Sequence, residues 1–173
     1  MKKIKDLSRL DIAELTRQLS KEKGTYLLFF EMRKPQTIRV GKLSETHFLP
    51  GFYAYVGSAF GPGGLHARLR HHLNISERNH WHLDYVRPAM HFVSLWLTED
   101  KECREHDWAA ALDAMPNSQL PVKDMGATDC QCSGHFFYFE QLPSLCEFRK
   151  MLRNRGALDA PVQVIRRYEE EAA

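Results

Sequence analysis

The clearest chemical signal in this chain of 173 residues is a pair of side chains, Arg68 and His72, in a segment with helical periodicity. Residues four apart share a face of a helix, and Leu65 and Leu69 fall on nearly the same side. The pair is therefore expected at the edge of the buried stripe. Arginine stays charged and can bind two phosphate oxygens at once, while histidine can accept a proton near neutral pH. These side chains suit cleavage of a phosphodiester bond, with the arginine stabilising the charge of the transition state.

The segment before this helix reads as a strand followed by a glycine-rich turn at residues 61–64. A glycine-rich turn before a basic helix is common in proteins that are not nucleases, and a half-buried histidine is more often structural than catalytic. The histidines of this region, His66, His71, His72, His80 and His82, are too many for all of them to be catalytic, and most are accordingly expected to be structural or exposed.

The periodicity of the remaining sequence predicts the elements that must position these residues. A peripheral helix is expected within residues 1–23, ended by Gly24. Strands are expected at residues 25–30, 37–40, 52–56, 92–97 and 135–140, and further helices at residues 102–114 and 145–154. The fold class is α+β, with a small, mainly antiparallel three-stranded sheet built from the segments near Tyr26, Ile38 and Tyr55. Helices bearing Arg68 and Glu105 flank it, with an extra C-terminal strand and helix.

The chain length favours a single domain. Its organisation is predicted as a peripheral helix at residues 1–23, a main body at residues 24–140, and a C-terminal helix and tail at residues 141–173 packed on that body. Composition is ordinary for a globular protein, with 43% hydrophobic and 27% charged residues. No apolar run approaches the roughly 20 residues that cross a membrane, and no signal peptide is recognised.

Charge and cysteine content complete this picture. The formal net charge of +2 does not by itself indicate a nucleic-acid binder, although a local basic patch would suffice to bind phosphates. Cys103, Cys130, Cys132 and Cys146 are expected to be reduced thiols in a cytoplasmic protein.

The ordered motifs resemble those of the GIY-YIG nuclease superfamily. Gly24-Thr25-Tyr26 begins one expected strand and Tyr55-Val56-Gly57 ends another, and the helix with Arg68 follows. The chain is similar in particular to the subfamily sometimes fused to endonuclease III, and the resemblance runs from about residue 24 to residue 140. The hallmarks that carry it lie at residues 51–59, 63–65, 80–85 and 129–135. The first motif has threonine where the family has isoleucine, the turn is longer than in many relatives, and Ser58 stands where a lysine is often found.

This resemblance implies a metal-dependent DNA endonuclease and its site residues. The implied catalytic residues are Tyr26, Tyr55, Arg68, His72 and Glu105. Glu105 would be the protein ligand of a Mg²⁺ or Mn²⁺ ion that is otherwise mostly hydrated. Glu102 is the alternative, but apolar residues follow Glu105 at helical spacing, and an acid at position 102 also suits a solvated helix start.

Further residues are assigned supporting roles. His82, Asn117 and His135 are possible supporting residues of the site, and Arg33, Ser58 and Arg70 are expected to contact nucleic acid. Asn117, which directly follows Pro116, would take the place of an asparagine found after the glutamate-bearing helix in many relatives. For the proton acceptor the interpretation favours Tyr26, with His72 as its helper. The opposite assignment stays open, because an unperturbed tyrosine has a pKa of about 10.

A separate short motif, Cys130-x-Cys132-x-x-His135, carries soft metal ligands. A structural zinc site normally needs four ligands, and His106 or Cys103 would complete it only if the fold brought one of them near. The favoured interpretation is a turn of Asp129, Cys130 and His135 that seats the late strand.

Three functions remain in consideration. The leading one is an endonuclease acting on DNA, in repair or on branched DNA, with a repair or DNA-processing protein as a further partner. The alternative is a nucleic-acid-binding module with this fold but little or no turnover. The third is a metal-bound regulatory or interaction domain that uses the Cys/His segment.

Overall fold

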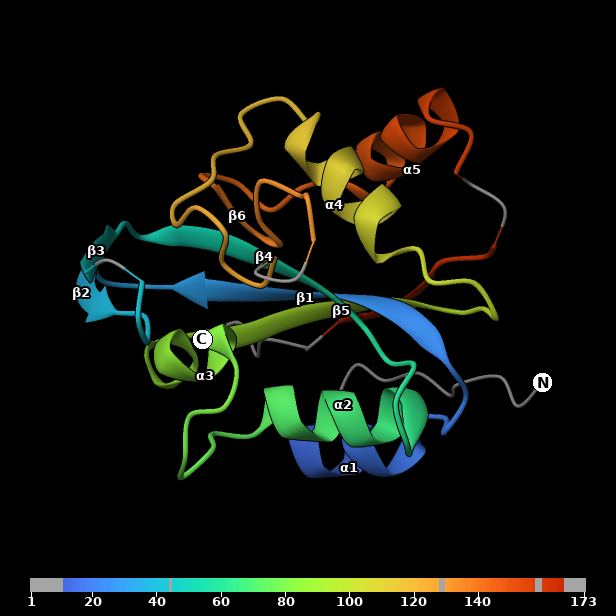
Figure 1. Ribbon diagram of the computed structural model, residues 1–173, viewed down its shortest axis with the longest axis horizontal. Helices are drawn as coiled ribbons and strands as arrows, with labels where there is room; N and C mark the ends of the chain where they lie inside the picture. Colours follow the sequence, from blue (N-terminus) through green and yellow to red (C-terminus); the bar gives the residue numbers. More distant parts are fainter. Residues whose placement is uncertain (1–10, 44, 128–129, 158–159, 167–173) are drawn as a thin grey trace, which may run out of the picture.

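The protein has an α+β fold built on a five-stranded antiparallel sheet (Figure 1). The computed structural model describes residues 11–43, 45–127, 130–157 and 160–166. The strand order is β6-β4-β1-β5-β7. The strands are β1 (Gly24–Met32), β4 (Gly51–Ser58), β5 (His91–Glu99), β6 (Phe136–Phe139) and β7 (Gln163–Arg166). The α+β class and the mainly antiparallel sheet are confirmed, whereas the expectation of three strands in the sheet is wrong.

The segment around Ile38 does not join the main sheet. It forms β2 (Gln36–Arg39), which pairs with β3 (Glu45–Phe48) in a separate two-stranded sheet. Three of the four residues of β2 are exposed, so this strand has too little apolar surface to occupy the centre of a sheet. The positions beside β1 belong instead to β4 and β5, which pair with it over most of its length.

Helices cover both faces of the sheet (Figure 1). The helices α1 (Ile12–Gln18) and α2 (Gly64–Leu73) lie on one face, and α4 (Glu105–Asp113) and α5 (Leu145–Asn154) lie on the other. Successive residues of a strand point to opposite faces. Accordingly Leu28 and Phe30 of β1 join the core beside α2, while Leu27 and Phe29 join the core beside α4. This double burial explains why β1 reads as a nearly continuous apolar run.

The N-terminal helix is shorter than expected. Within the described residues it begins after Asp11, whose carboxylate accepts a hydrogen bond from the Glu14 N–H, and it ends at Gln18. Residues 1–10 of the expected helix lie outside the described part. Gly24 does not end this helix but begins β1.

The start of α2 is held against the loop that follows α1. The backbone N–H groups of Leu65 and His66 donate to the carbonyls of Glu22 and Ser20, at 3.0 and 2.8 Å. Gly64 has φ +56°, and a Cβ there would collide with the backbone carbonyl of Lys21. Glycine is therefore required at the first turn of α2, because it alone combines this conformation with this close approach.

The other end of α2 is held by a buried arginine. Arg87, in the short helix η1 (Arg87–Ala89), donates to the carbonyls of His72 and Leu73 at 3.1 and 2.6 Å. A cation at a helix C-terminus also complements the helix dipole. With both ends held, α2 presents Arg68 in a defined position. Within the described residues, no helix has the length and apolar character needed to span a bilayer.

Candidate active site

A polar cavity of about 410 Å³ lies where β4 extends beyond β6, the strand at the edge of the sheet. The pairing of β4 with β6 ends at Tyr55, and a backbone hydrogen bond from Val56 to His135 closes it. Gly57 and Ser58 of β4 are therefore not covered by β6. The described residues that line the cavity come from both faces of the sheet and from two loops: Tyr26, Tyr55, Gly57, Ser58, Arg68, His80, Trp81, His82, Glu105, His106, Gly126, Cys130 and His135.

The register of two central strands places the tyrosines together. Tyr26 of β1 lies opposite Gly57 of β4, and Tyr55 lies opposite Leu28, so both tyrosine rings are on the α2 face. A Cβ on Gly57 would collide with the Tyr26 hydroxyl. Glycine at position 57 thus makes room for the Tyr26 ring, and the structure brings the two predicted tyrosines into one cavity.

Arg68 reaches this cavity from α2. Its guanidinium lies 4.6 Å from the centre of the Trp81 ring, a cation–π contact. Among the described residues it has no carboxylate partner. The charge of Arg68 is therefore available to an anion in the cavity.

Trp81 is itself held by a carboxylate that the sequence analysis did not assign. Asp84 of α3 (His82–Val86) accepts hydrogen bonds from the backbone N–H groups of His80 and Trp81, at 2.8 and 2.9 Å. It also lies 3.0 Å from Nε2 of His71 on α2. Burial would raise the pKa of Asp84, but these hydrogen bonds outweigh it and hold the pKa below its ordinary value. Asp84 thus fixes the loop that carries Trp81 to the helix that carries Arg68.

Glu105 enters the cavity from the first position of α4. The start of this helix is anchored by Thr25, whose hydroxyl accepts a hydrogen bond from the Arg104 N–H at 2.9 Å. One carboxylate oxygen of Glu105 accepts a hydrogen bond from Ser58 at 2.5 Å. The other lies 3.1 Å from Nδ1 of His135, although the two atoms are not aligned for a good hydrogen bond.

These contacts decide the charge of Glu105. Burial would raise the pKa of its carboxyl, but His135, Ser58 and the nearby His106 lower it below the ordinary value. Glu105 is consequently ionised at neutral pH. It is also the only carboxylate among the described residues that line the cavity.

His72 is close to the predicted partners but does not line the cavity. Its side chain is 1% exposed and packs behind the two tyrosines, with ring centres 6.0 Å from Tyr26 and 5.3 Å from Tyr55. Burial first, and then the neighbouring His71 and Arg68, lower the pKa of His72 to about 3. The imidazole is therefore neutral, and its Nδ1 atom has no hydrogen-bond partner among the described residues.

Tyr26 has the opposite perturbation. Burial, and then the neighbouring Tyr55, raise the pKa of its hydroxyl well above the ordinary value, while Arg68 lowers it and Glu105 raises it. The phenol is protonated at neutral pH. Before its oxygen can accept a proton the phenol must lose its own, and a nearby positive charge favours that loss. The same interactions indicate that Tyr26, Tyr55, Arg68 and Glu105 are close enough to act on one another.

The supporting residues predicted from the sequence divide into two groups. Ser58, His82 and His135 line the cavity, and Nδ1 of His82 accepts a hydrogen bond from the Gly126 N–H at 3.2 Å. Arg33, Arg70 and Asn117 do not line it.

Arg33, Arg70 and Asn117 lie outside the cavity for different reasons. Arg33 follows the far end of β1 and pairs with Glu31 at 2.9 Å. Arg70 is exposed on another side of α2 from Arg68. Asn117 lies beyond the last residue of α4, whereas Glu105 is its first residue, and a helix of this length spans about 13 Å.

The cavity also contains residues that sequence reasoning did not place there, among them His80, Trp81, His106 and Gly126. Trp81 belongs to one of the recognised motifs, at residues 80–85, but nothing local indicates that its ring lies beneath Arg68. His106 directly follows Glu105, so its presence could have been anticipated from the choice of Glu105.

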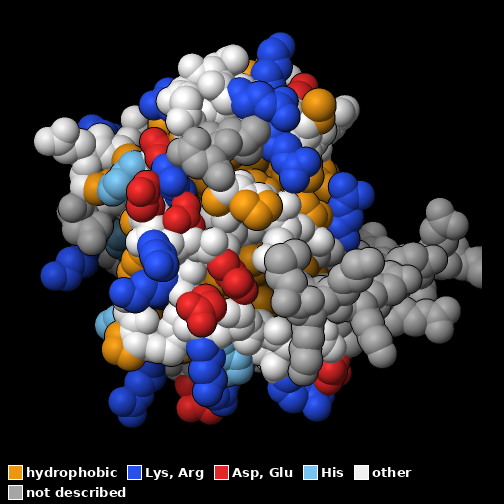
Figure 2. Space-filling model, turned by 90° about the vertical axis from the view of Figure 1, so that its right-hand side faces the viewer, with side chains coloured by type: hydrophobic (Ala, Val, Ile, Leu, Met, Phe, Trp, Pro, Cys, Tyr) orange, Lys and Arg blue, Asp and Glu red, His pale blue; other side chains and the backbone are white. Residues whose placement is uncertain are grey.

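The outer surface is mixed in charge. Figure 2 shows Lys and Arg side chains interspersed with Asp and Glu on one face, with positive side chains gathered toward the top, on the side of α5. That helix carries Arg149, Lys150 and Arg153. Neither positive nor negative side chains dominate this face, in keeping with the net charge of +2. Binding of an anion at the cavity would therefore depend on local cations such as Arg68.

Comparison with known proteins defines the family. The sequence pattern of the family described as "Domain of unknown function DUF123" matches residues 25–156, which is most of the chain. The chain belongs to this family, and the matched segment contains every described residue of the cavity. Neither the curated proteins nor the solved structures include a significant match to the chain.

Proposed function

We propose that this protein is a metal-dependent DNA endonuclease. The observation that carries the proposal is the convergence of Tyr26, Tyr55, Arg68 and Glu105 in one polar cavity, from four separate elements. The resemblance of the motifs to the GIY-YIG superfamily supports the same conclusion. Hydrolysis of a phosphodiester needs a cation for the phosphate oxygens, a group to orient or deprotonate water, and a carboxylate for a metal ion.

Arg68 would bind the phosphate. Its planar guanidinium can donate two parallel N–H···O hydrogen bonds to phosphate oxygens, and its stacking on the Trp81 ring limits its rotation. Because Arg68 has no carboxylate partner among the described residues, phosphate binding would not require an ion pair to break first.

The residues around Glu105 fit a hydrated divalent cation. The carboxylate is ionised, and within the described part of the chain each of its oxygens contacts one polar side chain, so each keeps a lone pair for a metal ion. One protein carboxylate with water as the other ligands is a common arrangement for Mg²⁺. Such an ion would supply positive charge that acidifies water and neutralises the leaving oxygen.

The tyrosines would orient the attacking water. Tyr26 is the preferred proton acceptor, with Tyr55 beside it on the same face of the sheet. It would accept the proton as a phenolate that has already released its own proton to solvent, a form that a bound cation and the nearby Arg68 would favour. His72 is neutral and buried behind both rings. It therefore acts on the reaction through the position of the tyrosines rather than by touching the substrate.

The test is cleavage of supercoiled plasmid and of branched DNA, with Mg²⁺, with Mn²⁺ and with neither ion. Arg68→Ala should lower the single-turnover rate on the order of 10²–10³-fold, the usual loss on removing one such donor. Arg153→Ala is the control, since Arg153 is exposed on α5, on the other face of the sheet, and does not line the cavity. It should keep the wild-type rate to within a few-fold.

Two outcomes would change the assignment. Equal rates for Arg68→Ala and the wild type would show that this cavity is not the catalytic site. Metal-independent DNA binding without cleavage of any DNA form would favour the alternative, a nucleic-acid-binding module that keeps the fold.

A further inference from the structure

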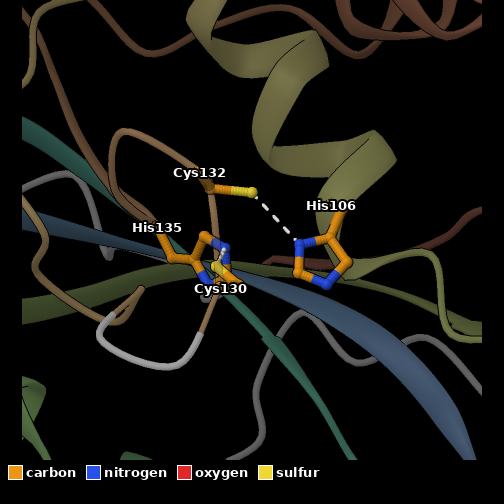
Figure 3. Close-up of side chains that lie close together, drawn as sticks. All are labelled: His106, Cys130, Cys132 and His135. Carbon is orange, nitrogen blue, oxygen red and sulfur yellow. Dashed lines mark hydrogen bonds between the residues drawn. The ribbon is translucent and has the colours of Figure 1, made fainter.

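Four soft metal ligands from two separate parts of the chain meet beside the cavity (Figure 3). They are His106 on α4 and Cys130, Cys132 and His135 in the connection that leads to β6. Nδ1 of His106 lies 3.1 Å from Sγ of Cys132, and Nε2 of His135 lies 3.5 Å from Sγ of Cys130. All four ligand atoms lie within 4.8 Å of one another.

These separations are close to those of a tetrahedral zinc site. Zinc bonds of about 2.3 Å to sulfur and about 2.0–2.1 Å to nitrogen place neighbouring ligand atoms about 3.3–3.8 Å apart. Two of the separations in the cluster are 3.1 and 3.5 Å, so small side-chain rotations suffice to reach that geometry. Two thiolates with two imidazoles in a tetrahedral arrangement favour zinc over magnesium or calcium, which prefer oxygen ligands.

We propose that His106, Cys130, Cys132 and His135 bind a structural zinc ion. The sequence motif Cys130-x-Cys132-x-x-His135 contains three of the four ligands, and the fold brings His106 beside them as the fourth. This proposal does not depend on nuclease activity, because it concerns a different metal held by a different set of residues.

The long connection between α4 and β6 explains what such an ion would stabilise. The described residues between Asp113 and Phe136 belong to no helix or strand, apart from one isolated bridge of Gln119 with Tyr138. Connections longer than about 12–15 residues without secondary structure are uncommon in compact domains. A zinc ion bound to Cys130 and Cys132 would fasten this connection to the start of α4 through His106.

His135 links the zinc site to the candidate active site. Its Nε2 atom faces Cys130, while its Nδ1 atom lies 3.1 Å from the Glu105 carboxylate. A metal-bound histidine usually directs its second nitrogen at a carboxylate, a backbone carbonyl or a water molecule, which fixes the orientation of the ring. In this arrangement the zinc ion would hold His135 in place, and His135 would hold Glu105 at the edge of the cavity.

The experiment measures metal content of the full chain, purified without chelator and analysed by inductively coupled plasma mass spectrometry. The wild type should contain about one zinc ion per chain. The double variant Cys130→Ser/Cys132→Ser should lose it. The matched control is Cys103→Ser/Cys146→Ser, which removes two exposed thiols outside the cluster and should retain zinc at the wild-type level.

A second measurement covers the case in which the double variant does not fold. The wild-type chain loaded with Co²⁺ should show the visible absorption of a tetrahedral site with thiolate ligands, and zinc should displace that signal. Wild-type protein without zinc that also gives no such spectrum would overturn the proposal. The same conclusion would follow from zinc retained in the Cys130→Ser/Cys132→Ser variant, or from Cys130 and Cys132 recovered as a disulfide with each other.

Discussion

Burial of a neutral histidine makes the stability of this protein depend on pH. The side chain of His72 is 1% exposed, and burial with its cationic neighbours lowers its pKa to about 3. In the unfolded chain the same side chain has a pKa of about 6.5. Below that pH the unfolded state takes up a proton that the folded state does not bind. The contribution of His72 is therefore full above about pH 6.5 and decreases as the pH falls.

The size of the effect follows from the two pKa values. A pH of 5 lies about 1.5 units below the pKa of the unfolded histidine, and each unit corresponds to about 1.4 kcal/mol. Between pH 8 and pH 5, His72 should lower the free energy of unfolding by about 2 kcal/mol. His72→Leu, with an apolar side chain of similar volume, should remove this part of the pH dependence.

The assay is urea-induced unfolding at several pH values from 8 to 5, followed by tryptophan fluorescence. The wild type should lose about 2 kcal/mol more than His72→Leu over this range. The groups that face His72, namely His71, Asp84 and Arg68, remain in both proteins, so the difference between the two proteins reports on His72. The exposed His91 gives the control, since His91→Gln should follow the wild type. Parallel curves for the wild type and His72→Leu would refute the reasoning.

Three further predictions test the site. Tyr26→Phe keeps the ring but removes the hydroxyl, and should nearly abolish cleavage under single-turnover conditions. His72→Gln should keep partial activity. An inactive His72→Gln beside an active Tyr26→Phe, measured across pH, would make His72 the proton acceptor. Crystals soaked in Mn²⁺ should show anomalous density beside Glu105 that is lost in Glu105→Gln, and density elsewhere would reassign this metal. Gly57→Ala places a methyl group against the Tyr26 hydroxyl and should lower the free energy of unfolding by about 1–3 kcal/mol. If the variant unfolded at the same urea concentration as the wild type, the close contact between Gly57 and Tyr26 would be contradicted.

Several parts of the fold follow from local sequence patterns. The helix α5 has the bounds predicted for it, Leu145–Asn154, because Ser144 caps its first turn and its apolar residues recur at helical spacing. The apolar runs of β1 and β4, and the glycine turn before α2, were equally readable. The ordered motifs also placed Tyr26, Tyr55 and Arg68 on elements that meet in one cavity.

Other parts were decided only when distant segments packed together. The pattern at residues 36–39 is that of a strand, but its exposed positions leave it in a separate hairpin, while β7, with two apolar residues between polar ones, completes the main sheet. Strand pairing depends on which surfaces must be buried together, and a local pattern does not contain that information.

The same holds for the chemistry of individual side chains. Helical spacing put His72 on the face of Arg68, but the packing of Tyr26 and Tyr55 over it decided that His72 is buried and neutral. Likewise Cys130 and Cys132 were recognisable as potential metal ligands in the sequence, and His106 joined them only because the first turn of α4 lies beside that loop. Spacing along the chain determines which residue types share an element. Their burial, charge and partners depend on contacts between elements, which only the tertiary structure specifies.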